Sequence, residues 1–188
     1  VEAGEGISYT VTGNTQIYDG TPKVLTITPT PSDATIHYSL DNGLTYNSPT
    51  PPVYIEHGTY TIYFRITAAS GEPLDGQEET LTIESKPITA EMFRSSIDVS
   101  YTYSGNPIKP NPVVVDGPPM RKADTDYTVA WGTNTEVGLP TDEALLNGGG
   151  WVKVTGQGNY TDSATVYFEI LPVGADTSLT ASLTEYHG

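Results

Sequence analysis

The sequence predicts an all-β protein built from two tandem antiparallel β-sandwich modules. Its 188 residues include 13 Tyr, 19 Gly and 15 Pro, a composition that favours strands and turns over helices. Segments that alternate apolar and polar residues recur along the chain, as expected for strands with one buried face. A short Tyr-X-Gly stretch also recurs at intervals of about 85 residues, the length of a small domain.

These Tyr-X-Gly corners divide the chain. They are Tyr18-Asp19-Gly20, Tyr103-Ser104-Gly105 and Tyr186-His187-Gly188, and the first two are followed by Pro22 and Pro107. Glycine allows unusual backbone dihedrals and proline restricts φ after it, so each stretch predicts a chain corner. We therefore expect one module at 1–86, a second at 87–173, and a tail at 174–188 that begins a possible third repeat.

The first module is expected to contain six strands. The clearest is Thr59–Thr67, where Tyr60, Ile62, Phe64 and Ile66 share one face. Asp41-Asn42-Gly43 predicts a hairpin turn, and Gly13-Asn14 predicts a turn after the first strand. The remaining expected strands are Ile7–Thr12, Lys23–Thr28, Thr35–Leu40 with Leu40 facing inward, Leu44–Tyr46 and Glu79–Ile83.

The second module follows the short linker Ser85-Lys86-Pro87. Its expected strands are Asp98–Tyr103, Val113–Val115, Tyr127–Trp131, Trp151–Thr155 and Ala164–Ile170. Residues 141–148 form the single plausible helical turn, with Thr141 as cap and Gly148 as end. Short alternating strands with frequent turns favour the Ig-like sandwich. A β-grasp arrangement would also fit the periodicity, although such folds need a longer helix.

Composition excludes several classes of function. The net charge of −15, from 8 basic and 23 acidic residues, argues against binding to nucleic acids or anionic membranes. No apolar stretch is long enough to span a membrane, and no signal peptide is present, as expected of a cytosolic, processed or excised chain. The chain has no cysteine, so disulfides and cysteine-ligated zinc are impossible, which points away from secreted animal sandwich domains.

Several of these motifs resemble the repeats of large bacterial surface proteins. The Tyr-Asp-Gly at 18–20 is similar to the signature of the adhesin repeats named after that tripeptide. The second module resembles bacterial Ig-like surface repeats through residues 101–105, 112–116, 124–129 and 156–161, which end in Gly-Asn-Tyr-Thr. The resemblance implies extracellular, all-β modules that are repeated in series and carry no catalytic residues. The segment 141–148 departs from the short connection usual in that repeat.

Two sets of residues are candidates for ligand binding. Asp116, Asp124 and Asp126 surround a turn and could supply the oxygen ligands that calcium prefers, although no EF-hand loop is present and a simple turn explains them equally well. Tyr63 and Trp151 alternate with buried residues and could stack on sugar rings from an exposed sheet face. The competing interpretation is that the tryptophans fill the core or the module interface.

No catalytic site is expected. The chain lacks a phosphate-binding loop and a Gly-X-Ser-X-Gly nucleophile motif. Carboxylate pairs such as Asp124/Asp126, Asp142/Glu143 and Glu78/Glu79 occur by chance in a chain this acidic. The sequence thus predicts a non-catalytic structural or adhesive segment of a bacterial surface protein, whose partners are neighbouring repeats and a host or cell-wall glycan or protein. The alternative is a carbohydrate- or protein-binding module of a secreted protein.

Overall fold

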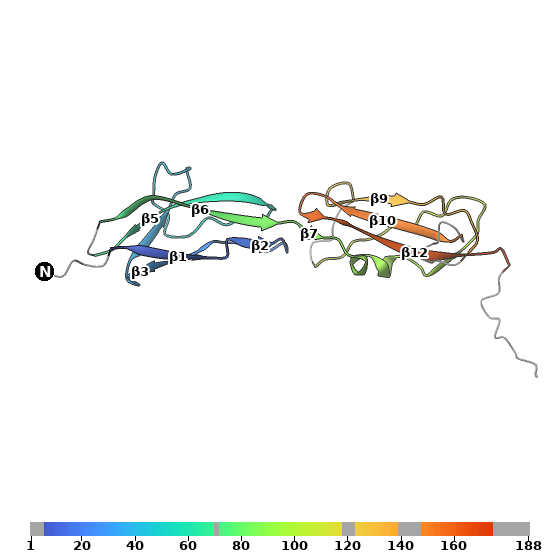
Figure 1. Cartoon of the computed structure of the whole chain (residues 1–188). Coiled ribbons are helices and arrows are strands. Elements are labelled where there is room, and N and C mark those ends of the chain that lie inside the picture. The colour runs from blue at the N-terminus through green and yellow to red at the C-terminus, as the bar shows by residue number, and fades with distance from the viewer. Residues whose placement is uncertain (1–5, 70–71, 118–122, 139–147, 175–188) are drawn as a thin grey trace, which may run out of the picture. The chain divides into compact units, whose positions relative to one another are not determined.

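The computed structural model describes residues 6–69, 72–117, 123–138 and 148–174, and these are all-β, as predicted (Figure 1). The chain forms two units, Val1–Pro87 with Gly158–Thr161, and Ile88–Gln157 with Asp162–Gly188. The described residues contain no α-helix, so they lack the helix that a β-grasp fold requires. The tail at 175–188, with the third Tyr-X-Gly corner, and most of the expected helical turn at 141–148 lie outside the described residues.

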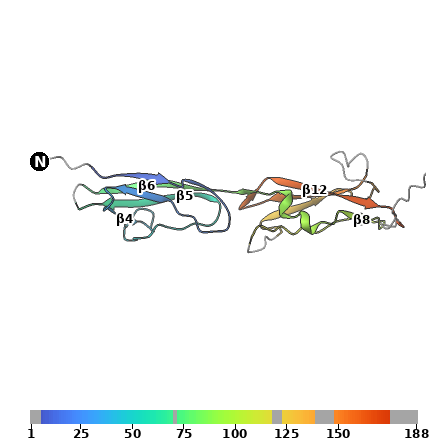
Figure 2. The same cartoon turned by 90° about the horizontal axis from the view of Figure 1, so that it is seen from below.

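The first unit is a two-layer sandwich. One layer pairs β1 (Ser8–Thr12) with β3 (Thr26–Thr30). The other has the strand order β2-β6-β5-β4, with β2 at Thr15–Ile17, β4 at Thr35–Tyr38, β5 at Gly58–Thr67 and β6 at Leu74–Glu84. Figure 2 shows β4, β5 and β6 in one layer. β7 (Lys86–Pro87) pairs in parallel with β11 (Tyr160–Thr161), and both strands belong to this unit.

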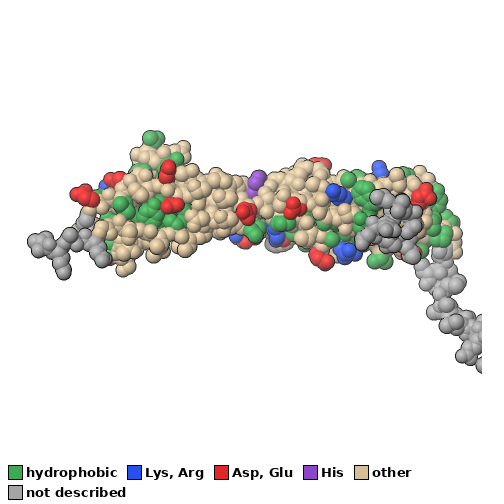
Figure 3. Space-filling model, in the orientation of Figure 1, with side chains coloured by type: hydrophobic (Ala, Val, Ile, Leu, Met, Phe, Trp, Pro, Cys, Tyr) green, Lys and Arg blue, Asp and Glu red, His purple; other side chains and the backbone are tan. Residues whose placement is uncertain are grey.

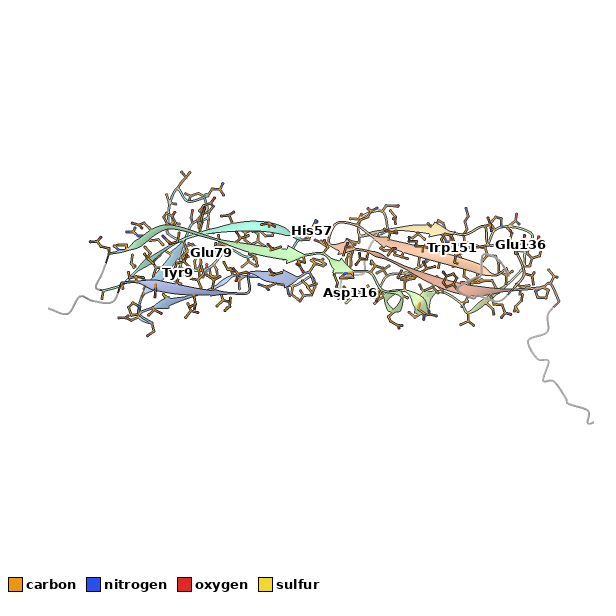
Figure 4. The ribbon with its side chains drawn as sticks, in the orientation of Figure 1. Tyr9, His57, Glu79, Asp116, Glu136 and Trp151 are labelled. Atoms are coloured by element: carbon orange, nitrogen blue, oxygen red, sulfur yellow. The ribbon has the colours of Figure 1, made fainter. Side chains whose placement is uncertain are left out.

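The expected alternation along β5 is confirmed. Ile62, Phe64 and Ile66 are buried and Tyr60 is half-buried on the same face. This face meets the other layer at Tyr9 of β1, whose ring packs edge-on against Phe64 with centroids 5.1 Å apart. The Tyr9 hydroxyl donates a hydrogen bond to Glu79 Oε1 of β6 at 3.1 Å (Figure 4), which ties the two layers together at their rim.

The second unit is built on a sheet of order β8-β12-β10-β9. These strands are Ser100–Thr102, Ser163–Leu171, Gly150–Gly156 and Tyr127–Trp131. Its buried face carries Val152, Val154, Val166, Phe168 and Ile170. The opposing layer is irregular: it holds two 3-10 turns, η1 (Ala90–Met92) and η2 (Arg94–Ser96), and the extended segment 108–115.

The two units share one topology, and each sheet contains one parallel pair instead of being wholly antiparallel as expected. β2 pairs in parallel with β6, and β8 with β12. In the first unit the cause is Gly13, whose φ of +79° shifts the chain from the layer of β1 to that of β2 without reversing it. The predicted turn at Gly13-Asn14 is a bend that carries the chain from one layer to the other.

Both Tyr-X-Gly corners follow these parallel strands and are built alike. Tyr18 N donates to Glu84 O, and Tyr103 N donates to Leu171 O, each at 2.8 Å, so each corner is tied to the end of its unit's last long strand. Gly20 and Gly105 have φ of +78° and +80°. In each corner the side chain of the residue before glycine accepts a hydrogen bond from the backbone N–H of the residue after glycine. Asp19 Oδ1 accepts from Thr21 N at 2.8 Å, and Ser104 Oγ accepts from Asn106 N at 3.4 Å.

Three further predictions are wrong, for two physical reasons. Leu44–Tyr46 forms no strand and Leu40 is 68% exposed, because Ser39 and Asp41 side chains bond the turn's own N–H groups and close a loop instead of a hairpin. Val113–Val115 forms no strand, because flanking Pro110 and Pro112 cannot donate to a ladder. Its bonds go from Val113 N to Ser96 Oγ and from Val115 N to Met92 O.

Candidate functional site

The candidate site is a hollow on the outer face of the second unit's sheet. Its volume is about 200 Å³, and it is lined by Trp151, Lys153, Thr165 and Tyr167. The register places Trp151 opposite Tyr167, and Lys153 opposite Thr165, on the neighbouring strands β10 and β12. Since side chains alternate along a strand, all four point away from the buried face formed by Val152 and its neighbours. Figure 4 labels Trp151 on β10.

The sequence identified Trp151 but not its three neighbours. The alternation of Trp151 with Lys153, and of Thr165 with Tyr167, is visible in the sequence. What brings the two pairs together is the register of β10 on β12, which the sequence does not reveal. One signal could have identified these neighbours. On the outer face of each of the two strands, an aromatic residue and a polar residue stand two positions apart.

Asn134 holds the backbone of Trp151 in place. This residue is 2% exposed, and its side-chain Nδ2 donates to Ile108 O at 2.7 Å and to Trp151 O at 3.1 Å. Its Oδ1 accepts a hydrogen bond from Trp151 N at 3.0 Å. A buried amide with these bonds is well satisfied and ties two loops to the start of β10.

Gly132 makes room for the Trp151 ring. A Cβ at this glycine would lie 2.5 Å from Trp151 Nε1 and 2.6 Å from Asn134 Oδ1, closer than real contacts allow. The indole therefore lies directly against the backbone of residue 132. Asn134 thus holds the backbone of Trp151, and the backbone at Gly132 supports the edge of its ring.

Trp131 lies on the opposite face of the same sheet. It pairs with the buried Val152, and its Nε1 donates to Pro110 O at 2.7 Å. Lys109 Nζ lies 5.8 Å from the centroid of the Trp131 ring. Trp131 thus contributes to packing, while Trp151 faces the hollow on the outer side of the sheet.

Tyr63, the other aromatic candidate, belongs to the first unit and is partly covered. It stands on the outer face of β5 opposite Glu78. A Cβ at Gly43 would lie 3.3 Å from Tyr63 Cδ1 and 3.4 Å from the Tyr46 hydroxyl, so the loop after β4 lies against the ring. Tyr63 belongs to the first unit and Trp151 to the second, so neither unit by itself carries both aromatic candidates.

The carboxylates do not form a metal-binding group among the described residues, where no three Asp, Glu or His side chains come together. Asp116, Asp124 and Asp126 are among the described residues, so this finding covers the three calcium candidates. Asp124 lies in a turn with φ of +64°, and its N–H donates to Tyr127 O at 2.7 Å. This geometry matches the turn interpretation of Asp124-Thr125-Asp126.

Of the carboxylate pairs considered for catalysis, Glu78/Glu79 does not converge. Glu78 and Glu79 are adjacent on β6 and therefore point to opposite faces of its sheet. Glu79 is engaged by Tyr9. Asp142 and Glu143 lie outside the described residues. Figure 3 shows acidic side chains scattered over each unit rather than gathered in one patch.

Among the described residues, two carboxyl pKa values are strongly shifted, and both belong to structural turns. Hydrogen bonds from Lys23 and Thr21 lower the pKa of Asp19, whose Oδ2 lies 2.6 Å from Lys23 Nζ. Hydrogen bonds from Thr45 and Ser39 lower the pKa of Asp41 to about 2. Strongly shifted pKa values often mark active sites, but here each is explained by a turn that the carboxylate closes.

No protein-family model and no curated protein sequence matches the chain. Among solved structures, the crystal structure of Drosophila N-cadherin EC1-3 is similar to it, with 12% sequence identity and a TM-score of 0.24 over 90% of this chain and 68% of that one. At this TM-score the likeness carries no argument about function. No helix among the described residues is long and apolar enough to cross a membrane.

Proposed function

We propose that the chain is a non-catalytic structural or adhesive stalk segment of a secreted or wall-attached bacterial surface protein. Its modules are 1–86 and 87–173, followed by a tail at 174–188 that begins a third repeat. Its partners are the neighbouring repeats of the parent protein, with a host or cell-wall glycan or protein as ligand. The absence of cysteine and the resemblance of the Tyr-Asp-Gly and Gly-Asn-Tyr-Thr motifs support a bacterial origin.

The observation that carries this proposal is the repeated corner. In both units the first strand of the four-stranded sheet runs parallel to the last long strand. The N–H of the Tyr that directly follows this first strand donates a hydrogen bond to the end of the last one. Two units with the same strand order and the same corner are what a serial repeat requires. The high negative charge keeps such a surface soluble and limits non-specific association.

The parallel pairing suits a segment that bears tension. When the ends of a unit are pulled apart, the parallel strands at the start and the end of its four-stranded sheet slide along one another, so their hydrogen bonds are loaded together. In the first unit these bonds join Thr15–Ile17 to Thr82–Glu84, with Thr82 N to Asn14 O at 2.7 Å beside them. An antiparallel pair pulled apart at one end would instead open one bond at a time.

Single-molecule pulling of the full chain from its ends tests the stalk. We expect two unfolding events, each releasing about 25–30 nm, the contour length of some 85 residues less the folded span. As a geometric control, Thr59→Cys and Glu84→Cys place handles near the end where β5 and β6 pair, so that this pair unzips. The control should unfold at lower force. Equal forces in the two geometries, or unfolding at negligible force, would contradict a load-bearing role.

A second candidate, a carbohydrate-binding module of a secreted protein, is favoured by the hollow at Trp151. Carbohydrate sites combine an aromatic surface with a few fixed polar groups, and this hollow has two aromatic rings, a hydroxyl and an ammonium group. Titration of the full chain with simple glycosides, followed by the indole NMR signal of Trp151, tests it. Binding that shifts this signal supports the module, and an unchanged signal with every glycoside argues against it.

A further inference from the structure

The hollow offers a specific combination of chemical groups. Trp151 and Tyr167 face each other across β10 and β12, and Lys153 and Thr165 form the next pair along the same strands. Opposite residues in an antiparallel pair have Cβ atoms about 5 Å apart, so one small ligand can touch all four. The volume of about 200 Å³ is below the roughly 300–1,000 Å³ of sites for drug-sized ligands. A single ring fits this size better than an extended chain.

Lys153 gives the hollow a positive charge that no carboxylate among the described residues pairs with. The chain has 23 acidic and 8 basic residues, so there are enough carboxylates for every basic side chain to form an ion pair. Lys23 pairs with Asp19 at 2.6 Å, and Arg65 Nε lies 2.6 Å from Asp75 Oδ1. Among the described residues Lys153 forms no ion pair. A half-buried lysine that lines a hollow together with two aromatic residues is complementary to a ligand that carries a negative charge.

The net charge of −15 does not outweigh this local attraction. At physiological ionic strength charges farther apart than about 8 Å are largely screened, so the acids scattered over the surface repel a ligand weakly. A hydrogen bond between an ammonium and a carboxylate is made at contact distance. It is about twice as strong as one between neutral groups. The contact with Lys153 therefore determines that the hollow prefers a negatively charged ligand to a neutral one.

The outer position of Trp151 is fixed before any ligand arrives. All four side chains stand on two paired strands, and the outer position of Trp151 is held by the Asn134 hydrogen bonds and by the close approach of Gly132. A ligand that meets an ordered surface loses less affinity to the cost of ordering side chains. This matters for a shallow site, which makes few contacts.

We propose that this face binds a sugar ring that carries a carboxylate, as in a uronic acid. The ring lies against Trp151 and Tyr167, Lys153 donates to the carboxylate, and the Thr165 hydroxyl bonds a ring hydroxyl. The inference rests on the second candidate function, carbohydrate binding, and names its ligand class. It adds a charge preference and three residues to the single tryptophan that the sequence identified.

The test compares methyl glucuronide with methyl glucoside, which differ in the carboxylate alone, and with acetate, which has the carboxylate without the ring. Each is titrated into the full chain and followed by the indole NMR signal of Trp151. We expect the glucuronide to bind at least about tenfold more tightly than the other two. Lys153→Met, which keeps the side-chain stem, should remove that preference. The matched control is Lys109→Met, which changes the net charge equally beside Trp131 and should have no effect.

The remaining outcomes separate this inference from the function on which it rests. If glucoside and glucuronide bind equally, and Lys153→Met changes neither, the carboxylate preference is overturned while sugar binding stands. If acetate binds as well as the glucuronide, the site recognises an anion, such as an acidic peptide side chain, and the sugar assignment is overturned. If no glycoside shifts the Trp151 signal, both this inference and the carbohydrate-binding candidate are wrong.

Discussion

Gly150 is the position where one added methyl group should be most informative. It is buried at the start of β10 and pairs with Phe168 of β12. A Cβ at this position would lie 2.2 Å from Phe168 Cε2 and 2.3 Å from Cζ, far inside the 3.5–4.0 Å separation that carbon atoms prefer. Gly150→Ala therefore requires the Phe168 ring to move.

The Phe168 ring has little room to do so. It is 0% exposed, and its other side meets the ring of Tyr101 at a centroid distance of 4.9 Å. Overpacking of this kind typically costs about 1–3 kcal/mol of unfolding free energy. In an open strand position the same change would stabilise by about 0.5–1 kcal/mol, because glycine loses more backbone entropy on folding. The two effects have opposite signs, so the sign of the measured change identifies which one dominates.

Both tryptophans of the chain lie in the second unit, so tryptophan fluorescence follows the unfolding of that unit. We expect Gly150→Ala to lower its melting temperature by roughly 5–20 °C, at about 4–8 °C per kcal/mol for a domain of this size. The control Thr155→Ala changes an exposed residue of the same strand and should stay within about 0.5 kcal/mol. Combining Gly150→Ala with Phe168→Leu should recover part of the loss. A single Gly150→Ala variant as stable as the parent would refute the steric argument.

Three further changes test other parts of the structure. Asn134→Asp replaces two donated hydrogen bonds with a carboxylate facing carbonyl groups. It should cost about 1–3 kcal/mol of the second unit's stability, and unchanged fluorescence melting would contradict this. The pKa of Asp41 is lowered in the folded state from 3.8 to about 2, so its contribution is present above about pH 4 and is lost as the pH falls towards 2. Asp41→Asn should flatten the acid dependence of the first unit's urea midpoint, measured by circular dichroism, and an unaltered slope would show that the turn is not responsible. Tyr9→Phe removes the hydrogen bond to Glu79 and should lower the first unit's free energy of unfolding, taken from the same urea titration, by about 1 kcal/mol, whereas no change would mean that the bond contributes nothing net.

The strands that the sequence predicted well are those with strict alternation. Along β5 and β12 the buried residues are the apolar ones that alternate in the sequence, such as Phe64 and Phe168. This pattern is local, so it can be read without knowing which strands are neighbours. The short segments around Leu44 and Val113 failed because their hydrogen bonds go to side chains and to a 3-10 turn, which the alternation of apolar residues does not reveal.

By itself, the sequence determined the all-β class and the repeat interval, because composition and the alternation of side chains depend only on neighbouring residues. It left open whether Trp151 faces outward or fills the core. The tertiary structure alone decided which strands pair in parallel, how Asn134 fastens Trp151, and that Lys153, Thr165 and Tyr167 join it in one hollow. These features depend on the register between strands and on contacts between distant segments. Register is set by the packing of the whole unit, since a shift of one residue would turn every side chain of a strand to the opposite face.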